Sequence, residues 1–208
     1  DPTIVADFSV TTDGLEAPWG RARLVFIYDQ GRMSNPPRSM QEMYEYAKEH
    51  PGRLTYPEPP NFHGTTFLKQ VLLETTQHID WLSEPHSGER FDTATKPLWE
   101  FLDSLHPHLW RTGREFPDSA EVMMDLFSDG LLDIALSFNP NDASQRIIDG
   151  RFASSVRTYV HDAGTIGNTH FLAIPFNTSA RAGALVWINL LLSAEAQADK
   201  ASPSVWGD

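Results

Sequence analysis

Polar and aromatic side chains gather in two short segments that could hold a small ligand. The first segment, residues 61–66, opens a predicted helix and supplies the candidate ligand residues Phe62, Gly64, Thr65 and Thr66. Backbone N–H groups at a helix N-terminus, together with neighbouring hydroxyl groups, can bind an anion or a polar ligand group. The alternative is that Thr65 or Thr66 only caps the helix.

The second segment follows a predicted buried strand and supplies Ser137, Asn139 and Asn141 as hydrogen-bonding candidates. Capping of the next helix by Asn141 or Asp142 is the alternative, and it is compatible with ligand binding. Both segments follow buried strands that we expect to be parallel. They should therefore lie close together on one edge of a sheet, where open α/β sheets bind ligands. Trp19 precedes another predicted strand, where its ring could stack on a ligand.

The residue types exclude several kinds of chemistry. The chain has no cysteine, which excludes disulfides, zinc–thiolate sites and cysteine nucleophiles. It also lacks a glycine-rich phosphate loop, a nucleophile elbow and an HExxH helix. His106 and His108 flank Pro107 and have no third ligand nearby in the sequence, so they do not indicate a metal site. We therefore predict no catalytic residue, no metal ligand and no cofactor.

The 208-residue chain carries a formal net charge of −12, and its Lys and Arg residues are scattered. Because a basic stripe is absent, we do not expect it to bind nucleic acid. The sequence shows neither a recognisable signal peptide nor an apolar run long enough to span a membrane. A chain of this length can bury a sizeable core.

Apolar runs alternate with amphipathic segments along the chain. The runs predict strands at residues 24–28, 54–56, 133–137, 156–160 and 169–174. Helices are predicted at 40–50, where Ser39 and Glu42 form a capping box, and near 65–76, 94–106, 118–127, 139–149 and 182–200. Residues 77–92 are predicted to form a surface loop. This alternation indicates an α/β fold with a mixed five-stranded sheet flanked by helices.

Several segments together resemble one known family. They are EAPWG at 16–20, NPPRS at 35–39, HPGR at 50–53, SFNP at 137–140, GTIGNTHF at 164–171 and LLSAEAQ at 191–197. The combination resembles the periplasmic solute-binding proteins of ABC transporters and is most similar to their YnjB-type group. The resemblance covers residues 13–208.

This resemblance implies a type II periplasmic-binding fold, in which two α/β lobes joined by two crossing strands close on a solute. Residues 1–20 would be a linker that forms the incoming hinge, and 168–176 would form the outgoing one. Residues 21–208 would be a single α/β solute-binding lobe, the second of the family. The first lobe and the C-terminal return helices would have no counterpart here. We therefore expect self-association through the face that would meet the first lobe, with Trp19 and Trp206 at its edge.

The implied function is that of the non-catalytic solute-binding component of an ABC importer, with an ABC permease as its partner. It would bind a small polar solute or a metal in a cleft between two lobes, in a periplasmic or extracytoplasmic location. Trp19 would stack on the solute, while the residues of the two segments would bind its polar groups. An enzyme or a ligand-sensing domain built on the same fold is the alternative.

Overall fold

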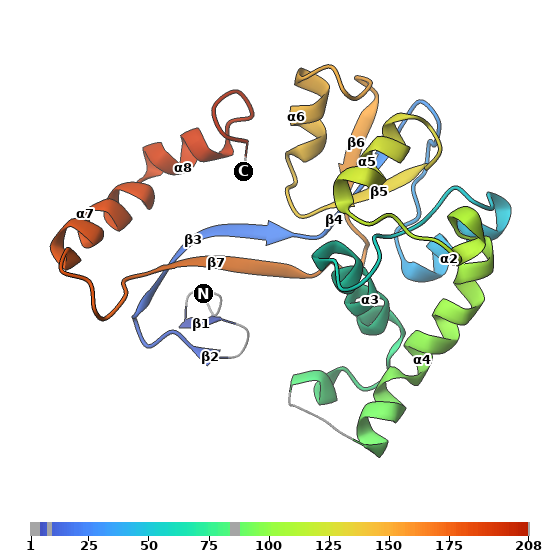
Figure 1. Cartoon of the computed structure of the whole chain (residues 1–208), viewed down its shortest axis with the longest axis horizontal. Coiled ribbons are helices and arrows are strands. Elements are labelled where there is room, and N and C mark those ends of the chain that lie inside the picture. Colours follow the sequence, from blue (N-terminus) through green and yellow to red (C-terminus); the bar gives the residue numbers. More distant parts are fainter. Residues whose placement is uncertain (1–4, 8–9, 84–87, 208) are drawn as a thin grey trace.

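A three-stranded antiparallel sheet lies at the centre of the globular part of the molecule (Figure 1). The computed structural model describes residues 5–7, 10–83 and 88–207. Strand β4 (Val25–Asp29) pairs on one side with β5 (Ile134–Ser137) and on the other with β6 (Val156–Tyr159). Phe26 and Ile27 of β4 are fully buried. Continuous apolar runs are typical of such strands, which are covered on both faces.

Helices α2 to α6 surround this sheet (Figure 1). The helices of the described residues are α2 (Met40–Glu49), α3 (Phe62–Thr75), α4 (Glu89–Leu105), α5 (Ala120–Ser128), α6 (Asp142–Ile148), α7 (Arg181–Leu191) and α8 (Ala194–Ala201), with 3-10 turns η1 (Ile79–Ser83), η2 (His106–His108) and η3 (Trp110–Gly113). The cap predicted for the first of them is confirmed, because Glu42 N–H donates to Ser39 Oγ over 3.1 Å.

Two helix predictions need correction. Helix α4 begins at Glu89, inside the segment predicted to be a loop, and residues 84–87 of that segment lie outside the described residues. The single helix predicted at 182–200 is divided into α7 and α8. Ser193 separates them because its backbone is extended and its Oγ accepts a hydrogen bond from Ala196 N–H over 3.2 Å, which starts a new helix.

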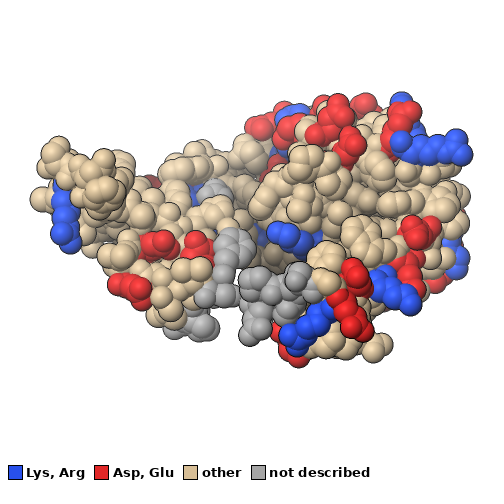
Figure 2. All heavy atoms as spheres, turned by 60° about the horizontal axis from the view of Figure 1, so that its bottom comes forward, with Lys and Arg blue, Asp and Glu red and all other residues tan. Residues whose placement is uncertain are grey.

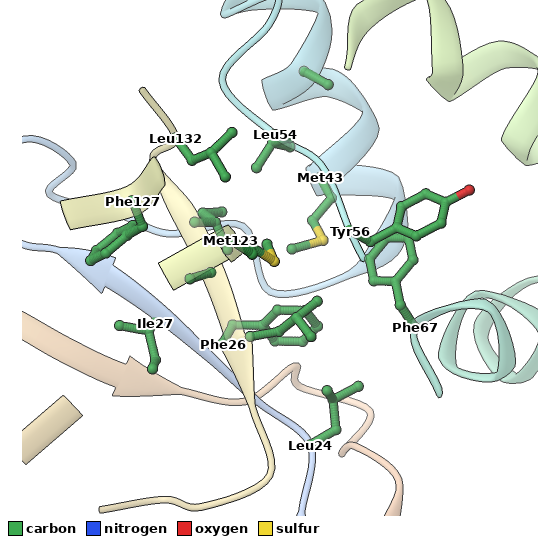
Figure 3. Close-up of a cluster of buried hydrophobic side chains, with 14 of the residues drawn as sticks. Leu24, Phe26, Ile27, Met43, Leu54, Tyr56, Phe67, Met123, Phe127 and Leu132 are labelled. Carbon is green, nitrogen blue, oxygen red and sulfur yellow. The ribbon is translucent and has the colours of Figure 1, made fainter. Parts of the chain in front are cut away.

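The hydrophobic core lies between the sheet and the helices (Figure 3). Phe26 comes from the sheet, Met43 from α2 and Met123 from α5. Tyr56 stacks on Phe67 of α3, with ring centroids 4.6 Å apart. Burying a large apolar side chain stabilises a fold by about 1.5–3 kcal/mol. This core therefore fixes the positions of α2, α3 and α5 against the sheet.

A long two-stranded ribbon extends from the globular part (Figure 1). It consists of β3 (Glu16–Arg23) and β7 (Gly167–Ala173), which pair antiparallel from Glu16 opposite Ala173 to Arg23 opposite Gly167. Helix α7 lies at its outer end, α8 runs back along the ribbon toward the globular part, and a small hairpin of β1 (Ala6–Asp7) and β2 (Val10–Thr11) lies beside the ribbon. We call the ribbon with α7 and α8 the arm.

The predicted mixed α/β architecture is present, but the single five-stranded sheet is corrected to a three-stranded sheet and a separate ribbon. Residues 169–173 of the fifth predicted strand pair with β3 in the ribbon. Residues 54–56 are extended, but they join no ladder among the described strands. The backbone carbonyl groups of this stretch accept hydrogen bonds from two different parts of the chain. Trp110 N–H donates to Leu54 O over 2.7 Å, and Asp133 N–H donates to Arg53 O over 2.9 Å.

A buried polar cluster holds the root of β7 against α3. Gln70 donates to Gly164 O over 3.1 Å and accepts from Ile166 N–H over 2.9 Å. Glu74 accepts from Gln70 over 2.8 Å and lies 2.6 Å from Nδ1 of His161, which stacks on Phe26. Helix α3 is thus fixed to the segment that leads into the ribbon.

Candidate functional site

The two predicted ligand segments meet on one rim of the globular part. The ring centroid of Phe138 lies 4.6 Å from that of Phe62 and 5.0 Å from that of His63. The prediction that the two segments lie close together is therefore confirmed. Parallel pairing is not the cause, because residues 54–56 form no strand ladder within the described residues. We call Phe62, His63 and Phe138 the aromatic rim.

Helix α3 begins three residues earlier than predicted. Asn61 is its N-cap, and its Oδ1 accepts from His63 N–H over 2.9 Å. Thr65 and Thr66 therefore lie inside the helix and do not cap it. Thr66 is only 4% exposed, which places its side chain on the buried face of α3. Thr65 is half-buried.

Gly64 has a clear packing role. A Cβ atom added at this position would lie 1.8 Å from the carbonyl oxygen of Pro57. Only glycine lets the first turn of α3 approach the preceding backbone so closely. This contact holds Phe62, which is 61% exposed, at the surface of the rim.

The three polar candidates of the second segment are joined in one local network. Ser137 Oγ donates to Asp142 Oδ2 over 2.8 Å and accepts from Asn139 N–H over 3.2 Å. Asn139 Oδ1 accepts from Asn141 N–H over 2.8 Å, and its Nδ2 donates to Gly207 O over 2.6 Å. Asn141 occupies the N-cap position of α6, where its side chain makes no capping hydrogen bond within the described structure.

Trp19 lies within β3, which corrects its predicted place in a loop before a strand. Its ring centroid is 5.4 Å from that of Trp206, and Lys200 Nζ lies 4.9 Å from the Trp19 ring centre. The structure therefore joins Trp19 to the C-terminal part of the arm. Phe62, Asn139 and Asn141, in contrast, belong to the two segments that meet at the aromatic rim.

His63 was not among the predicted site residues. Burial lowers the pKa of its imidazole, while the Asp142 and Glu121 carboxylates act in the opposite direction. A pKa below its ordinary value leaves His63 mostly neutral at pH 7. The signal available in the sequence was its position next to Phe62 at the opening of a helix.

The carboxylates near the rim are balanced by Arg146. Its side chain is 9% exposed, and its Nε and Nη2 lie 2.7 Å from Asp142 and 2.7 Å from Glu121. Among the described residues, no group of three or more His, Asp or Glu side chains could hold a metal ion. The rim therefore offers aromatic faces, a neutral imidazole and amide groups. Such groups suit stacking and hydrogen bonding.

No helix in the described ranges combines the length and the apolar character needed to cross a membrane. The arm contains a groove of about 530 Å³ between the outer end of the ribbon and α7. Leu15, Phe176 and Leu185 line it, and all three are exposed apolar residues. In Figure 2 the end of the molecule that carries α7 is mostly uncharged.

Three similar solved structures are named as binding proteins for small solutes or metal ions. A periplasmic thiamin binding protein matches with a TM-score of 0.60 and 15% identity over 97% of this chain and 58% of its own. Apo ferric ion-binding protein A from Pasteurella haemolytica matches with a TM-score of 0.65 and 13% identity over 97% and 58%. The spermidine/putrescine protein PotD from Streptococcus pneumoniae matches with a TM-score of 0.63 and 13% identity over 89% and 50%. The fold is that of type II periplasmic-binding proteins.

A curated relative is much closer in sequence. Protein YnjB from Escherichia coli K12 is 46% identical over 202 residues, which cover 97% of this chain and 52% of the relative. The chain thus spans about half the length of that protein. The family described as bacterial extracellular solute-binding protein matches residues 1–207. This chain belongs to the bacterial extracellular solute-binding protein family.

Proposed function

We propose that this chain is part of the solute-binding component of an ABC importer and that it binds a small solute without catalysing a reaction. The main observation behind this proposal is the aromatic rim, where two segments from different parts of the chain meet beside the root of a two-stranded ribbon. Membership of an extracellular solute-binding family supports this proposal and a location outside the cytoplasm, in the periplasm. An ABC permease would be the partner.

The solute would rest on Phe62, whose ring is exposed at the rim. Asn141 and Thr65 would supply hydrogen bonds from the two adjacent helix starts. Gly64, Thr66 and Ser137 would support the solute-binding surface from the interior, since all three are buried. Trp19 and Asn139 would reach the solute only by changing their present contacts with Trp206 and Gly207.

We further propose that the lobe expected at residues 21–208 is confined to its globular part, residues 24–166, because α7 lies apart from that part at the outer end of β3 and β7, which would be the two hinge strands. A first lobe would then cover the groove beside α7, where Leu185, Val186 and Trp187 are exposed. The globular part would supply one wall of the cleft, so this chain tested by itself would bind a solute weakly. An isolated chain would bury the same apolar face by self-association.

The aromatic rim favours a polar organic solute with a flat or cationic portion, because aromatic faces attract rings and cations. The structural neighbours carry thiamin, spermidine or putrescine, and ferric ion in their names. These compounds form a suitable first panel, together with sulfate and fructose-6-phosphate from two further neighbours.

A thermal-shift screen with this panel tests the proposal, using the chain and its Phe62→Ala and Phe91→Ala variants. Both phenylalanines are exposed, at 61% and 48%, but Phe91 lies on α4. A solute present at about ten times its Kd stabilises the folded state by about 1.4 kcal/mol. We expect one compound to raise the melting temperature, with the effect lost only in Phe62→Ala. A shift retained in Phe62→Ala, or chemical turnover of the compound, would contradict the proposal.

A further inference from the structure

The segment that follows α8 returns to the globular part of the molecule. We call residues 202–207 the strap. Figure 1 shows it turning from α8 toward α6. Its last described residue, Gly207, accepts a hydrogen bond from Asn139 Nδ2 over 2.6 Å. A Cβ atom at Gly207 would lie 3.3 Å from Gln145 Oε1 of α6, so the strap lies directly against that helix.

The local backbone of the strap aims its carbonyl group at Asn139. Val205 N–H and Trp206 N–H both donate to Ser202 O over 3.0 Å, which closes a tight turn. Gly207 follows with φ of +78°, in the left-handed region that favours glycine.

A second anchor fixes the strap and α8 to the ribbon. The Trp206 ring packs on Trp19 of β3 at 5.4 Å, and Lys200 Nζ lies 4.9 Å from the centre of the Trp19 ring. Gln197 Nε2 donates to Trp19 O over 3.2 Å. Lys200 is only 5% exposed, whereas α7, all of whose residues are described, buries none of its side chains. These contacts thus hold the C-terminal end of the arm against the ribbon.

We propose that Trp206 and Asn139 are positioning residues that hold the C-terminal end of the strap, Trp206 on the ribbon and Asn139 on the globular part, and thereby set the angle of the arm to the globular part. The strap is then a third connection between the two parts, beside β3 and β7. Asn139 directly follows Phe138 of the aromatic rim. The position of the strap and the binding of a solute at the aromatic rim are therefore linked. This link rests on the proposed function, whereas the anchoring of the strap does not.

The absence of cysteine allows spin labels to be placed at chosen positions. Labels at Ser144→Cys on α6 and Ala198→Cys on α8, both exposed, report the distance between the globular part and the arm. Pulsed electron resonance on the full chain, diluted with excess unlabelled chain, needs no solute. Failure of this inference is therefore distinguishable from failure of the proposed function.

Two variants weaken one anchor each. Asn139→Asp keeps the acceptor for Asn141 N–H and removes the donor to Gly207, and Trp206→Ala removes the stacked ring. Trp187→Ala is the matched control, since Trp187 and Trp206 are 60% and 58% exposed. We expect one narrow distance distribution in the parent and the control, and a distribution about twofold broader when both anchors are changed.

Circular dichroism spectra and melting temperatures of all variants confirm that they fold. An unchanged distance distribution in the folded double variant would overturn the proposal. Equal broadening in Trp187→Ala would also overturn it, because the arm would then respond to any loss of an aromatic side chain.

Discussion

At the scale of single residues, Gly64 controls the position of the aromatic rim. Its backbone lies so close to Pro57 that a methyl group would overlap the Pro57 carbonyl oxygen. We expect Gly64→Ala to destabilise the fold by about 1–3 kcal/mol, the usual cost of overpacking. Gly183→Ala is the control, since a Cβ atom at this position in α7 meets nothing within 4 Å. Urea unfolding should show no loss for the control, and equal stability of both variants would contradict the close contact.

Glu74 makes stability depend on pH. Burial acts to raise the pKa of its carboxyl group, but hydrogen bonds from His161, Gln70 and Met40 N–H outweigh this and hold the pKa below its ordinary value of 4.5. A pKa lowered in the folded state stabilises the fold above pH 4.5. This contribution is lost as the pH falls below that value toward the pKa of the folded state.

We therefore expect Glu74→Gln to lower the free energy of unfolding by about 2 kcal/mol at pH 7, since hydrogen bonds to a charged group are lost. The difference between parent and variant should shrink as the pH falls below 4.5. Urea unfolding at a series of pH values measures both effects. Parallel pH profiles of the parent and the variant would show that Glu74 does not carry this dependence.

At the scale of elements, an ion pair fixes the extended segment at residues 54–56, which no strand ladder holds within the described residues. Arg53 Nε donates to Asp133 Oδ2 over 3.0 Å just before the segment, and Tyr46 of α2 donates to the same oxygen over 2.7 Å. Asp133 directly precedes β5, and its side chain is only 10% exposed. These bonds tie α2, the extended segment and the sheet together.

We expect Asp133→Asn to lower the free energy of unfolding by about 2–3 kcal/mol, because two donors lose their charged acceptor. Glu100→Gln is the control, since Glu100 pairs with Lys96 at 3.6 Å and both side chains are largely exposed. Exposed pairs contribute at most about 1 kcal/mol. Chemical denaturation compares the two variants, and similar losses would mean that the Asp133 contacts do not anchor the segment.

Most element positions follow from local sequence signals. The buried run at β4 and the caps at Ser39 and Ser119 depend on neighbouring residues alone, so they were predictable. The pairing of β7 with β3 was not, because an apolar run does not specify its partner strand. The early start of α3 was missed because Asn61 can act as a cap as readily as Thr65.

The sequence predicted that the two candidate segments lie close together, but it did not predict the hydrogen bonds and burial of their residues. The two segments were selected because turns after buried strands are common ligand positions, although only the second of them follows a paired strand in the described residues. The hydrogen bonds of Ser137 and Asn139 could not be foreseen, since Gly207 is 68 residues from Asn139 in the chain. His63 was passed over because its burial and its carboxylate neighbours arise from tertiary packing.

At the scale of the whole molecule, the arm presents an apolar surface that isolated domains rarely leave bare. Leu185, Val186, Trp187 and Leu190 of α7 are 53%, 72%, 60% and 52% exposed. Leu185 also lines the groove of about 530 Å³ at the outer end of the ribbon. The exposed apolar face is thus centred on α7, whereas Trp206, which is exposed, and Trp19, which is half-buried, pack on each other.

We expect the isolated chain to self-associate through α7, because apolar burial contributes about 25 cal/mol per Å². Sedimentation velocity over a range of concentrations should show a dimer that Trp187→Glu abolishes, since a charge cannot be buried there without a partner. Trp99→Glu, at a 50% exposed position on α4, should leave the dimer intact. A monomer at every concentration would contradict self-association. Loss of the dimer in both variants would show that the contact does not depend on α7.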